Sequence, residues 1–263
     1  MSPKLLLISA LTSLCLASPA WAESPQEKGL AIFKEADRLN DGFVDSVASV
    51  RMVLRDKKGD TAERSIKIKA LEGPENEGDK TLMVFETPKD QKGTALLTWQ
   101  HQSRDDDQWL YLPALKRVKK IASKSKSGPF MGSEFSFEDV GGQQVDDYEY
   151  TWLRDEPLDG QDCFVVESRP KDSNSGYTRV VSWLDKQHYR TLKSEFYDRK
   201  NSLLKTLVAS EFSLYSDKFW RPARTAMKNA QTGKSTDLLT DSLSFGNGLS
   251  ESDFTQNSLQ RAR

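Results

Sequence analysis

The sequence predicts a mainly β protein built around one strongly curved antiparallel sheet, or an open barrel. From Val47 onward, apolar and polar residues alternate, which is the pattern of half-buried strands. Turn-forming sequences such as Lys-Gly-Asp at 58–60 and Asp-Gly at 159–160 separate about a dozen of these runs, so most successive strands are expected to be hairpin neighbours. Because no recurrent helix separates the strands, a wound parallel sheet is excluded.

Residues 1–22 have the three-part form of a cleavable secretion signal. Lys4 precedes an apolar run at 5–16, and Ala-Trp-Ala at 20–22 provides the small residues that favour cleavage. The apolar run is too short to span a bilayer. We therefore expect a signal peptide over residues 1–22, followed by one exported domain over residues 23–263.

The two cysteines differ in their expected fate. Cys15 lies inside the signal and follows Thr-Ser-Leu rather than the small residues of a lipid-attachment site, so we expect a soluble protein and not an anchored one. Cys163 then remains alone in the exported chain, where it cannot form an internal disulfide. Stability must come from a core, and we expect Cys163 to be a small buried apolar residue on a strand.

Residues 23–41 carry the pattern of an amphipathic helix that ends before Gly42. Its apolar residues recur at three- and four-residue spacings, namely Leu30, Ile32, Phe33, Ala36 and Leu39. The sequence at 37–42 is similar to a calcium loop, but Ala48 stands where the closing glutamate would lie. We therefore interpret this segment as the end of a helix and expect no calcium site.

Two stretches, 81–85 and 108–112, place large apolar side chains on both faces of a predicted strand. Such a strand is covered on both faces. In a curved sheet, the concave face is then filled by a helix, by loops or by a ligand. The candidate residues for an apolar ligand site are Met83, Phe85, Trp99, Trp109, Tyr111, Phe130, Met131 and Phe135.

Residues 105–140 contain the strongest local signals. Pro113 cannot continue a central strand, so the sequence predicts a strand at 108–112, a corner, and a second strand. Phe130 and Met131 follow on a loop flanked by glycines. Apolar side chains on such a loop are expected to pack against another apolar surface.

A basic run follows the corner, with Lys116, Arg117, Lys119 and Lys120 close together. One interpretation is a solvated edge strand that its lysines protect from aggregation. The alternative is a docking surface for anionic headgroups or for an acidic membrane partner, such as an inner-membrane transporter.

Residues suited to catalysis are scarce. Only two histidines are present, His101 and His188, and neither has an acidic residue at a helical ligand spacing, so a zinc site or a general base is not indicated. The three aspartates at 105–107 fit a solvated turn, because successive strand residues point to opposite faces. No nucleophile elbow, phosphate loop or dinucleotide fingerprint is present, and a net charge of −1 does not point to nucleic acid. We expect no enzyme, no catalytic residues, no metal and no cofactor.

Several motifs together resemble a known family. Trp109-x-Tyr111-x-Pro113 and the later Pro-Phe-Met at 129–131, with the segments 195–199 and 219–222, resemble the LolA-like family of outer membrane lipoprotein-sorting proteins, related to the periplasmic lipoprotein carrier LolA. The resemblance implies an unclosed antiparallel β-barrel, with an N-terminal helix and short helices or loops plugging its concave face around an apolar cavity for acyl chains. No residue's role is carried over from the carrier.

The resemblance and the residues together lead to a functional hypothesis. We expect a periplasmic carrier or chaperone that holds the acyl chains of a lipid or lipoprotein and takes part in outer membrane lipoprotein sorting. Burying a dozen methylenes contributes roughly 10 kcal/mol before ordering costs, so binding needs no catalytic group. The alternative is a non-carrying accessory module of an inner-membrane exporter, in which the same fold has a filled core.

Overall fold

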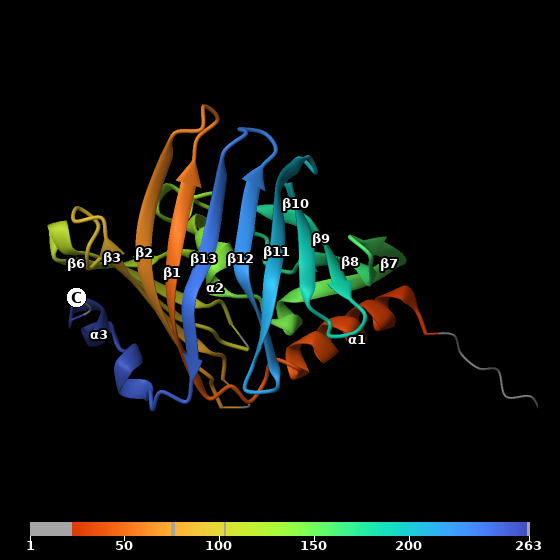
Figure 1. The fold of residues 1–263 in the computed structure, drawn as a ribbon, viewed down its shortest axis with the longest axis horizontal. Helices are drawn as coiled ribbons and strands as arrows, with labels where there is room; N and C mark the ends of the chain where they lie inside the picture. Colours follow the sequence, from red (N-terminus) through yellow and green to blue (C-terminus); the bar gives the residue numbers. More distant parts are fainter. Residues whose placement is uncertain (1–22, 75–76, 103, 262–263) are drawn as a thin grey trace, which may run out of the picture.

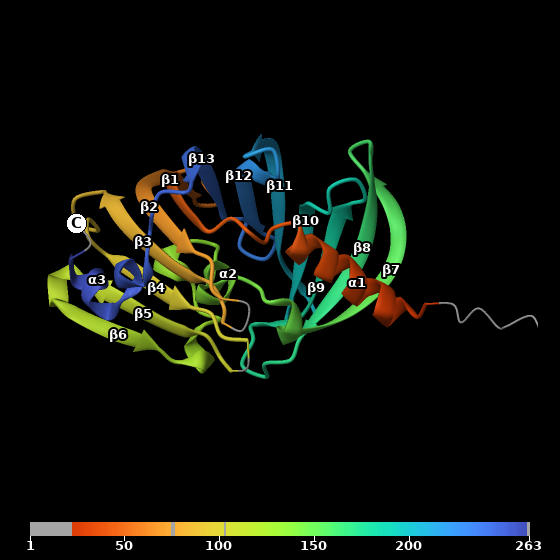
Figure 2. The ribbon, with the colours of Figure 1, turned by 90° about the horizontal axis from the view of Figure 1, so that it is seen from below.

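The computed structural model describes residues 23–74, 77–102 and 104–261, and in it one antiparallel sheet of thirteen strands forms the body of the protein. The sheet is curved and does not close, as Figures 1 and 2 show, which confirms the predicted fold class. The predicted signal peptide, residues 1–22, lies outside the described residues. The strands are β1 (Asp45–Arg55), β2 (Thr61–Leu71), β3 (Lys80–Thr87), β4 (Ala95–Trp99), β5 (Asp107–Leu112), β6 (Arg117–Ile121), β7 (Tyr148–Leu158), β8 (Gln161–Pro170), β9 (Tyr177–Asp185), β10 (Thr191–Asp198), β11 (Leu203–Tyr215), β12 (Phe219–Asn229) and β13 (Ser235–Phe245).

The strand order explains the open shape. From one edge to the other it is β6-β5-β4-β3-β2-β1-β13-β12-β11-β10-β9-β8-β7. The first and last strands of the chain, β1 and β13, pair in the middle, while β6 and β7 form the two free edges. The segment that joins β6 to β7 must therefore cross from one edge of the sheet to the other.

The helix α1 (Pro25–Arg38) forms where the sequence predicts it. Ser24 is its N-cap and forms a capping box with Glu27, and Pro25 fits the first turn because its missing N–H would have no partner there. The helix packs on β7 and β8 through a cluster that includes Ile32, Tyr150 and Val166. None of the helices in the described ranges is both long and apolar enough to cross a membrane.

The two faces of β3, β4 and β5 are covered by different parts of the chain. The inner, concave face carries Phe85, Leu96 and Leu110, which pack together with Phe130 from the β6–β7 segment. The outer face of the same strands carries Leu82, Val84, Leu97 and Trp109.

A C-terminal segment that the sequence did not reveal covers this outer face. It contains a short 3-10 turn (Glu251–Phe254) and α3 (Gln256–Arg261), which insert Phe254 and Leu259 against the strands. Both faces are therefore apolar because both are buried, as the alternation of side chains requires.

The other half of the sheet has a second core on its outer face. Val165, Val181, Trp183 and Leu192 pack there around Cys163, which is buried and unpaired. The Cys163 thiol donates a hydrogen bond to the carbonyl oxygen of Gln161 at 3.4 Å, and burial raises its pKa. This thiol thus behaves as a buried structural residue.

Candidate functional site: the plugged concave face

The segment between the two free edges, residues 122–147, occupies the concave side of the sheet, and we call it the plug. It contains the 3-10 turns Ser123–Ser125, Phe130–Gly132 and Val145–Asp147, together with α2 (Phe137–Gly141). Figure 2 shows α2 enclosed by the curve of the sheet. The position of the plug follows from the topology, because β6 and β7 lie at opposite edges.

Phe130 anchors the plug in the apolar part of the concave face. Its side chain has no exposed surface, and its ring centroid lies 5.7 Å from that of Phe85 and 5.5 Å from that of Phe137. A tight loop presents it: the Phe130 N–H donates to the carbonyl oxygen of Phe135 at 2.7 Å, and the Ser133 hydroxyl donates to the Phe130 carbonyl at 2.7 Å. Met131 holds a left-handed φ of 49°, which costs a residue with a Cβ on the order of 1 kcal/mol.

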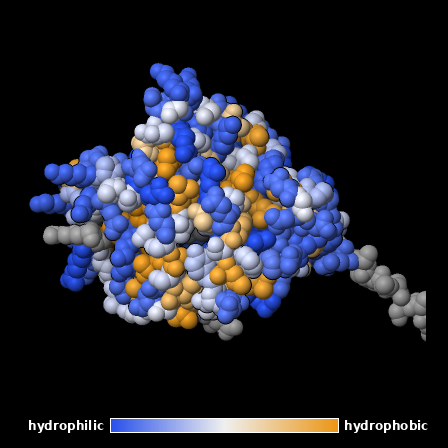
Figure 3. Space-filling model, in the orientation of Figure 1, coloured by the Kyte–Doolittle hydropathy of each residue, from blue (hydrophilic) through white to orange (hydrophobic). Residues whose placement is uncertain are grey.

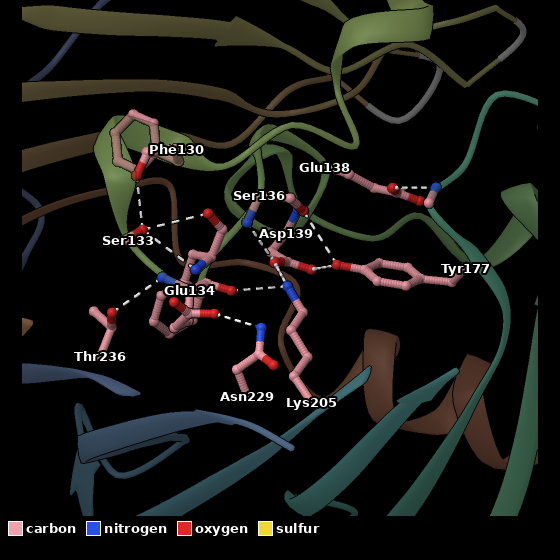
Figure 4. Close-up of polar contacts among 12 residues, drawn as sticks. Phe130, Ser133, Glu134, Ser136, Glu138, Asp139, Tyr177, Lys205, Asn229 and Thr236 are labelled. Carbon is pink, nitrogen blue, oxygen red and sulfur yellow. Dashed lines mark hydrogen bonds and ion pairs between the residues drawn. The ribbon is translucent and has the colours of Figure 1, made fainter. Parts of the chain in front are cut away.

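A buried polar cluster holds the other side of the plug, and we call Asp139, Tyr177 and Lys205 the latch (Figure 4). The Lys205 ammonium pairs with Asp139 at 2.5 Å and donates to the carbonyl oxygen of Glu134 at 2.9 Å. The Tyr177 hydroxyl donates to the other oxygen of Asp139 at 2.7 Å. The side chains of Lys205 and Asp139 are only 5% and 7% exposed, so water screens this ion pair little.

The protonation of the latch is set by its burial. Burial, and then the negative charge of Asp139, raise the pKa of Tyr177 far above its usual value, so its hydroxyl stays a donor at physiological pH. Ser136 caps α2: its hydroxyl accepts from the Asp139 N–H at 3.1 Å, and its own N–H donates to the Asp139 carboxylate at 2.6 Å. The Asp139 carboxylate therefore accepts hydrogen bonds from the Lys205 ammonium, the Tyr177 hydroxyl and the Ser136 N–H. These hydrogen bonds compensate for its removal from water.

Further polar contacts tie the plug to β12, β13 and the β8–β9 turn. The Glu134 side chain accepts from Asn229 at 2.7 Å, and its backbone N–H donates to the Thr236 hydroxyl at 3.0 Å. Glu138 accepts from the Gly176 N–H at 3.0 Å. The plug thus makes polar contacts to the C-terminal half of the sheet. Its contacts to the N-terminal half combine the apolar packing of Phe130 with hydrogen bonds from Arg64 to the Met131 carbonyl and from Gln108 to the Phe137 carbonyl.

A cleft of about 400 Å³ lies where the plug meets the two edges of the sheet. Its lining includes Asp106, Glu138 and Asp147, and burial raises the pKa of all three carboxyl groups, that of Asp106 to about 6. No group of three or more potential metal ligands is found in the part of the chain that the structure describes.

The chain is similar to known proteins over most of its length. A family model described as an uncharacterized protein matches residues 77–261. The chain is similar to the crystal structure of an outer membrane lipoprotein-sorting protein domain from Vibrio parahaemolyticus, with 51% identity over 90% of this chain and 100% of that one, and a TM-score of 0.87. The chain belongs to the LolA-like family of outer membrane lipoprotein-sorting proteins.

Two further structures are similar to the chain. A DUF1329 family protein from Desulfovibrio piger is 30% identical over 90% of this chain and 99% of its own, with a TM-score of 0.85. A LolA superfamily protein from Nitrosomonas europaea, 21% identical over 88% of this chain and 98% of its own, shares the fold with a TM-score of 0.71. No curated protein matches the chain at a significant level.

In this LolA-like chain, the residues predicted to line an apolar site fall on two faces of the sheet. Met83, Phe85, Phe130 and Met131 belong to the concave cluster, and Phe135 is buried within the plug.

The remaining three, Trp99, Trp109 and Tyr111, lie on the outer face in the cluster that α3 covers. The Trp99 indole N–H donates to the carbonyl oxygen of Phe254 at 2.7 Å, which fixes it there. The split arises because adjacent strand residues point to opposite faces, and the sequence does not indicate which face is concave.

The four basic residues lie together at the corner after β5 and on the edge strand β6, where Lys116, Arg117, Lys119 and Lys120 are all exposed. Lys120 also pairs with Asp107 at 2.6 Å. Burial opposes ionisation of Asp107, but hydrogen bonds from Lys120, Arg104 and His101 outweigh it and lower its pKa to about 2.

Sequence reasoning missed the latch entirely. Lysine is almost never fully buried unless it is paired, so Lys205 within a strand reads as a surface residue. The two arginines of the first strand, Arg51 and Arg55, take no part in the latch, because they pair with Asp241 and Asp237. The signal for the latch was absent because its three members are far apart in the chain.

Proposed function

We propose that this LolA-like protein is a periplasmic carrier or chaperone that binds the acyl chains of a lipoprotein or another lipid. The relative from Vibrio parahaemolyticus is described as an outer membrane lipoprotein-sorting domain, which supports a role in lipoprotein sorting. The binding surface is the concave apolar cluster around Phe85, and the plug occupies it in the absence of cargo. The role is one of binding and needs no catalysis.

The apolar packing of Phe130 on the concave face carries this proposal. An acyl chain can replace Phe130 against Phe85 and Leu96 without loss of apolar burial, because its methylenes each contribute about 0.8 kcal/mol. Burying a phenylalanine side chain contributes only about 1.5–3 kcal/mol, so a chain of several methylenes outcompetes it. The latch then sets the free energy that cargo must supply to move the plug.

The filled concave face favours a second candidate. Phe130 has no exposed surface, so in this conformation the apolar cluster is a packed core. A non-carrying accessory module of a membrane exporter would keep the plug in place and act through its outer surfaces. Under either candidate, the basic corner at Lys116, Arg117, Lys119 and Lys120 is proposed to dock on an anionic membrane surface or an acidic membrane partner.

Replacing Phe130 by alanine separates the two candidates. In a permanently packed core, Phe130→Ala lowers the free energy of unfolding by about 3–5 kcal/mol and creates no lipid site. In a carrier, the plug docks more weakly, global stability falls by less, and the affinity for the fluorescent fatty acid parinaric acid increases.

Phe254→Ala is the matched control, because Phe254 is equally buried but lies on the outer face under α3. It should lower stability without changing the affinity for parinaric acid. A stability loss for Phe130→Ala equal to that of Phe254→Ala, with no saturable binding of parinaric acid by either variant or by the wild type, would show that the protein is not a carrier.

A further inference from the structure

A second cleft lies outside the plug, at the end of the sheet where α1 stops. It has a volume of about 700 Å³ and is lined by the last turn of α1, the β9–β10 turn and the hairpin of β11 and β12. Figures 1 and 2 show that the end of α1 lies beside these turns. None of its lining residues belongs to the plug, so it is a separate site. Its volume is in the range of sites for small ligands.

Arg221 in this cleft is a cation without a counterion. In the part of the chain that the structure describes, no carboxylate forms an ion pair with its guanidinium, and burial lowers its pKa. Among the described residues, the guanidinium donates to the Asn40 side-chain oxygen at 2.6 Å and to the Trp220 carbonyl at 3.1 Å. Arginine stays protonated in proteins, so burying its guanidinium costs free energy. No ion pair offsets that cost at Arg221.

The position of this guanidinium is fixed. The Asn40 amide accepts from Arg221 and donates at 2.7 Å to the carbonyl oxygen of Ala36 in the last turn of α1. The rings of Phe219 and Phe245 lie 5.4 Å and 5.8 Å from the guanidinium carbon. A planar donor held in this way is suited to bind a carboxylate through two parallel hydrogen bonds.

The walls of the cleft are aromatic and apolar. The His188 ring lies 4.9 Å from the Trp220 ring, and Leu214 at the rim is 45% exposed. The second arginine of the cleft, Arg190, is already neutralised by Asp185 at 2.8 Å and stacks on Phe212 at 4.9 Å. Among the described residues, Lys218 at the rim also forms no ion pair and donates to the Asp41 carbonyl oxygen. The cleft therefore offers unpaired positive charge, from Arg221 and Lys218, beside an apolar surface.

The apolar surface continues beyond the cleft. A smaller hollow of about 330 Å³ adjoins it, because both are lined by Arg190 and Phe212. The hollow is lined further by Leu158, Leu192 and Val208, and Val208 is 44% exposed. Figure 3 shows apolar residues interrupting the hydrophilic outer face of the sheet. A charged head at Arg221 could thus be followed by a flexible apolar tail along this surface.

We propose that this cleft binds a single-chain amphiphile with a carboxylate head, such as a long-chain fatty acid. Arg221 binds the carboxylate, Trp220 and Phe212 contact the first methylenes, and the adjoining hollow takes the rest of the chain. Arg190 is paired with Asp185, so Arg221 and Lys218 against Asp217 leave one net positive charge in the lining, which matches a monoanion. The site does not depend on movement of the plug.

Calorimetric titration of the full chain with laurate below its micelle concentration tests the charge pairing. Arg221→Met keeps the apolar stem and removes the charge, and we expect it to weaken laurate binding by at least about tenfold. Lys228→Met removes an exposed charge from the same strand and should leave the affinity unchanged. The uncharged analogue dodecanol should bind the wild type no more tightly than laurate binds Arg221→Met.

A second variant avoids any effect on folding. Leu214→Glu places a negative charge at the exposed rim and should weaken laurate binding by about tenfold. A photoreactive fatty acid should label residues of 187–191 and 212–222 even when the plug is intact. Equal laurate affinity of Arg221→Met and wild type, tighter binding of dodecyl phosphate than of laurate, or labelling confined to the concave face would overturn the proposal.

Discussion

Replacing Lys205 by methionine tests how the plug is held. Methionine keeps most of the apolar stem but removes the ammonium, so the buried Asp139 carboxylate loses its ion pair at 2.5 Å. Removing one partner of a buried pair costs about 3–5 kcal/mol if the other stays buried. The plug has another option, because it can leave the sheet and return Asp139 to water. The cost is then limited to the free energy that docks the plug.

We predict that the plug is released when Lys205 is replaced. Lys205→Met should lower the free energy of global unfolding by less than about 2 kcal/mol, because only the plug is released. Backbone amides of residues 122–147 should exchange hydrogen faster, while those of β1–β5 keep their protection. Affinity for parinaric acid should rise, since the concave face becomes free. Guanidinium titration, hydrogen exchange and fluorescence together measure these changes.

The double variant Lys205→Met with Asp139→Asn is the control for charge. It removes both members of the pair, so no unpaired carboxylate is left at position 139 and the plug should dock more tightly than in the single variant. A global loss of about 3–5 kcal/mol in Lys205→Met, with unchanged exchange in the plug and no gain in lipid affinity, would show that the plug stays docked when the ion pair is lost.

Three other predictions follow from particular residues. The pKa of Asp106 in the folded protein is about 6, above its ordinary value of 3.8, so the native state loses stability as the pH rises from 3.8 through 6. Asp106→Asn should therefore raise the free energy of unfolding by about 1–3 kcal/mol at pH 7.5 and hardly at all at pH 4. Equal effects of the substitution at both pH values would contradict this prediction. Changing Lys116 and Lys119 to glutamate should weaken binding to anionic vesicles by at least about tenfold at low salt, with an unchanged melting temperature, whereas Lys228→Glu should have no such effect. Equal binding of all variants would leave the basic run with edge protection alone. The exported protein should begin at Glu23, and an intact mass that includes a diacylglycerol group would contradict a soluble carrier.

Much of the fold could be predicted because its signals are local. Alternation of apolar and polar residues indicates strands wherever one face is buried, and Pro113 marks the corner between β5 and β6. The capping box at Ser24 and the apolar spacing that follows it are likewise contained within one segment, α1. The C-terminal α3 spans only six residues, Gln256–Arg261, which is too short to show helical periodicity.

The candidate site could be predicted only in part, because it depends on contacts between distant segments. Phe130 was identifiable as an apolar residue on a glycine-flanked loop, but its latch joins residues 139, 177 and 205. Trp99 and Trp109 are apolar strand residues like Phe85, and only the position of α3 shows that they face outward. The sequence fixes alternation along a strand, whereas the curvature of the sheet decides which face becomes concave.

Mass spectrometry of organic extracts shows whether the protein holds acyl chains in its native compartment. The protein should be purified from its native compartment in the absence of detergent, together with the Lys205→Met variant and an unrelated exported protein of similar size. If the protein is a carrier, the wild-type extract should contain acyl-bearing lipid or lipoprotein, the Lys205→Met extract should contain more of it, and the control should contain none. Extracts of wild type and variant that match the control would contradict a carrier of acyl chains.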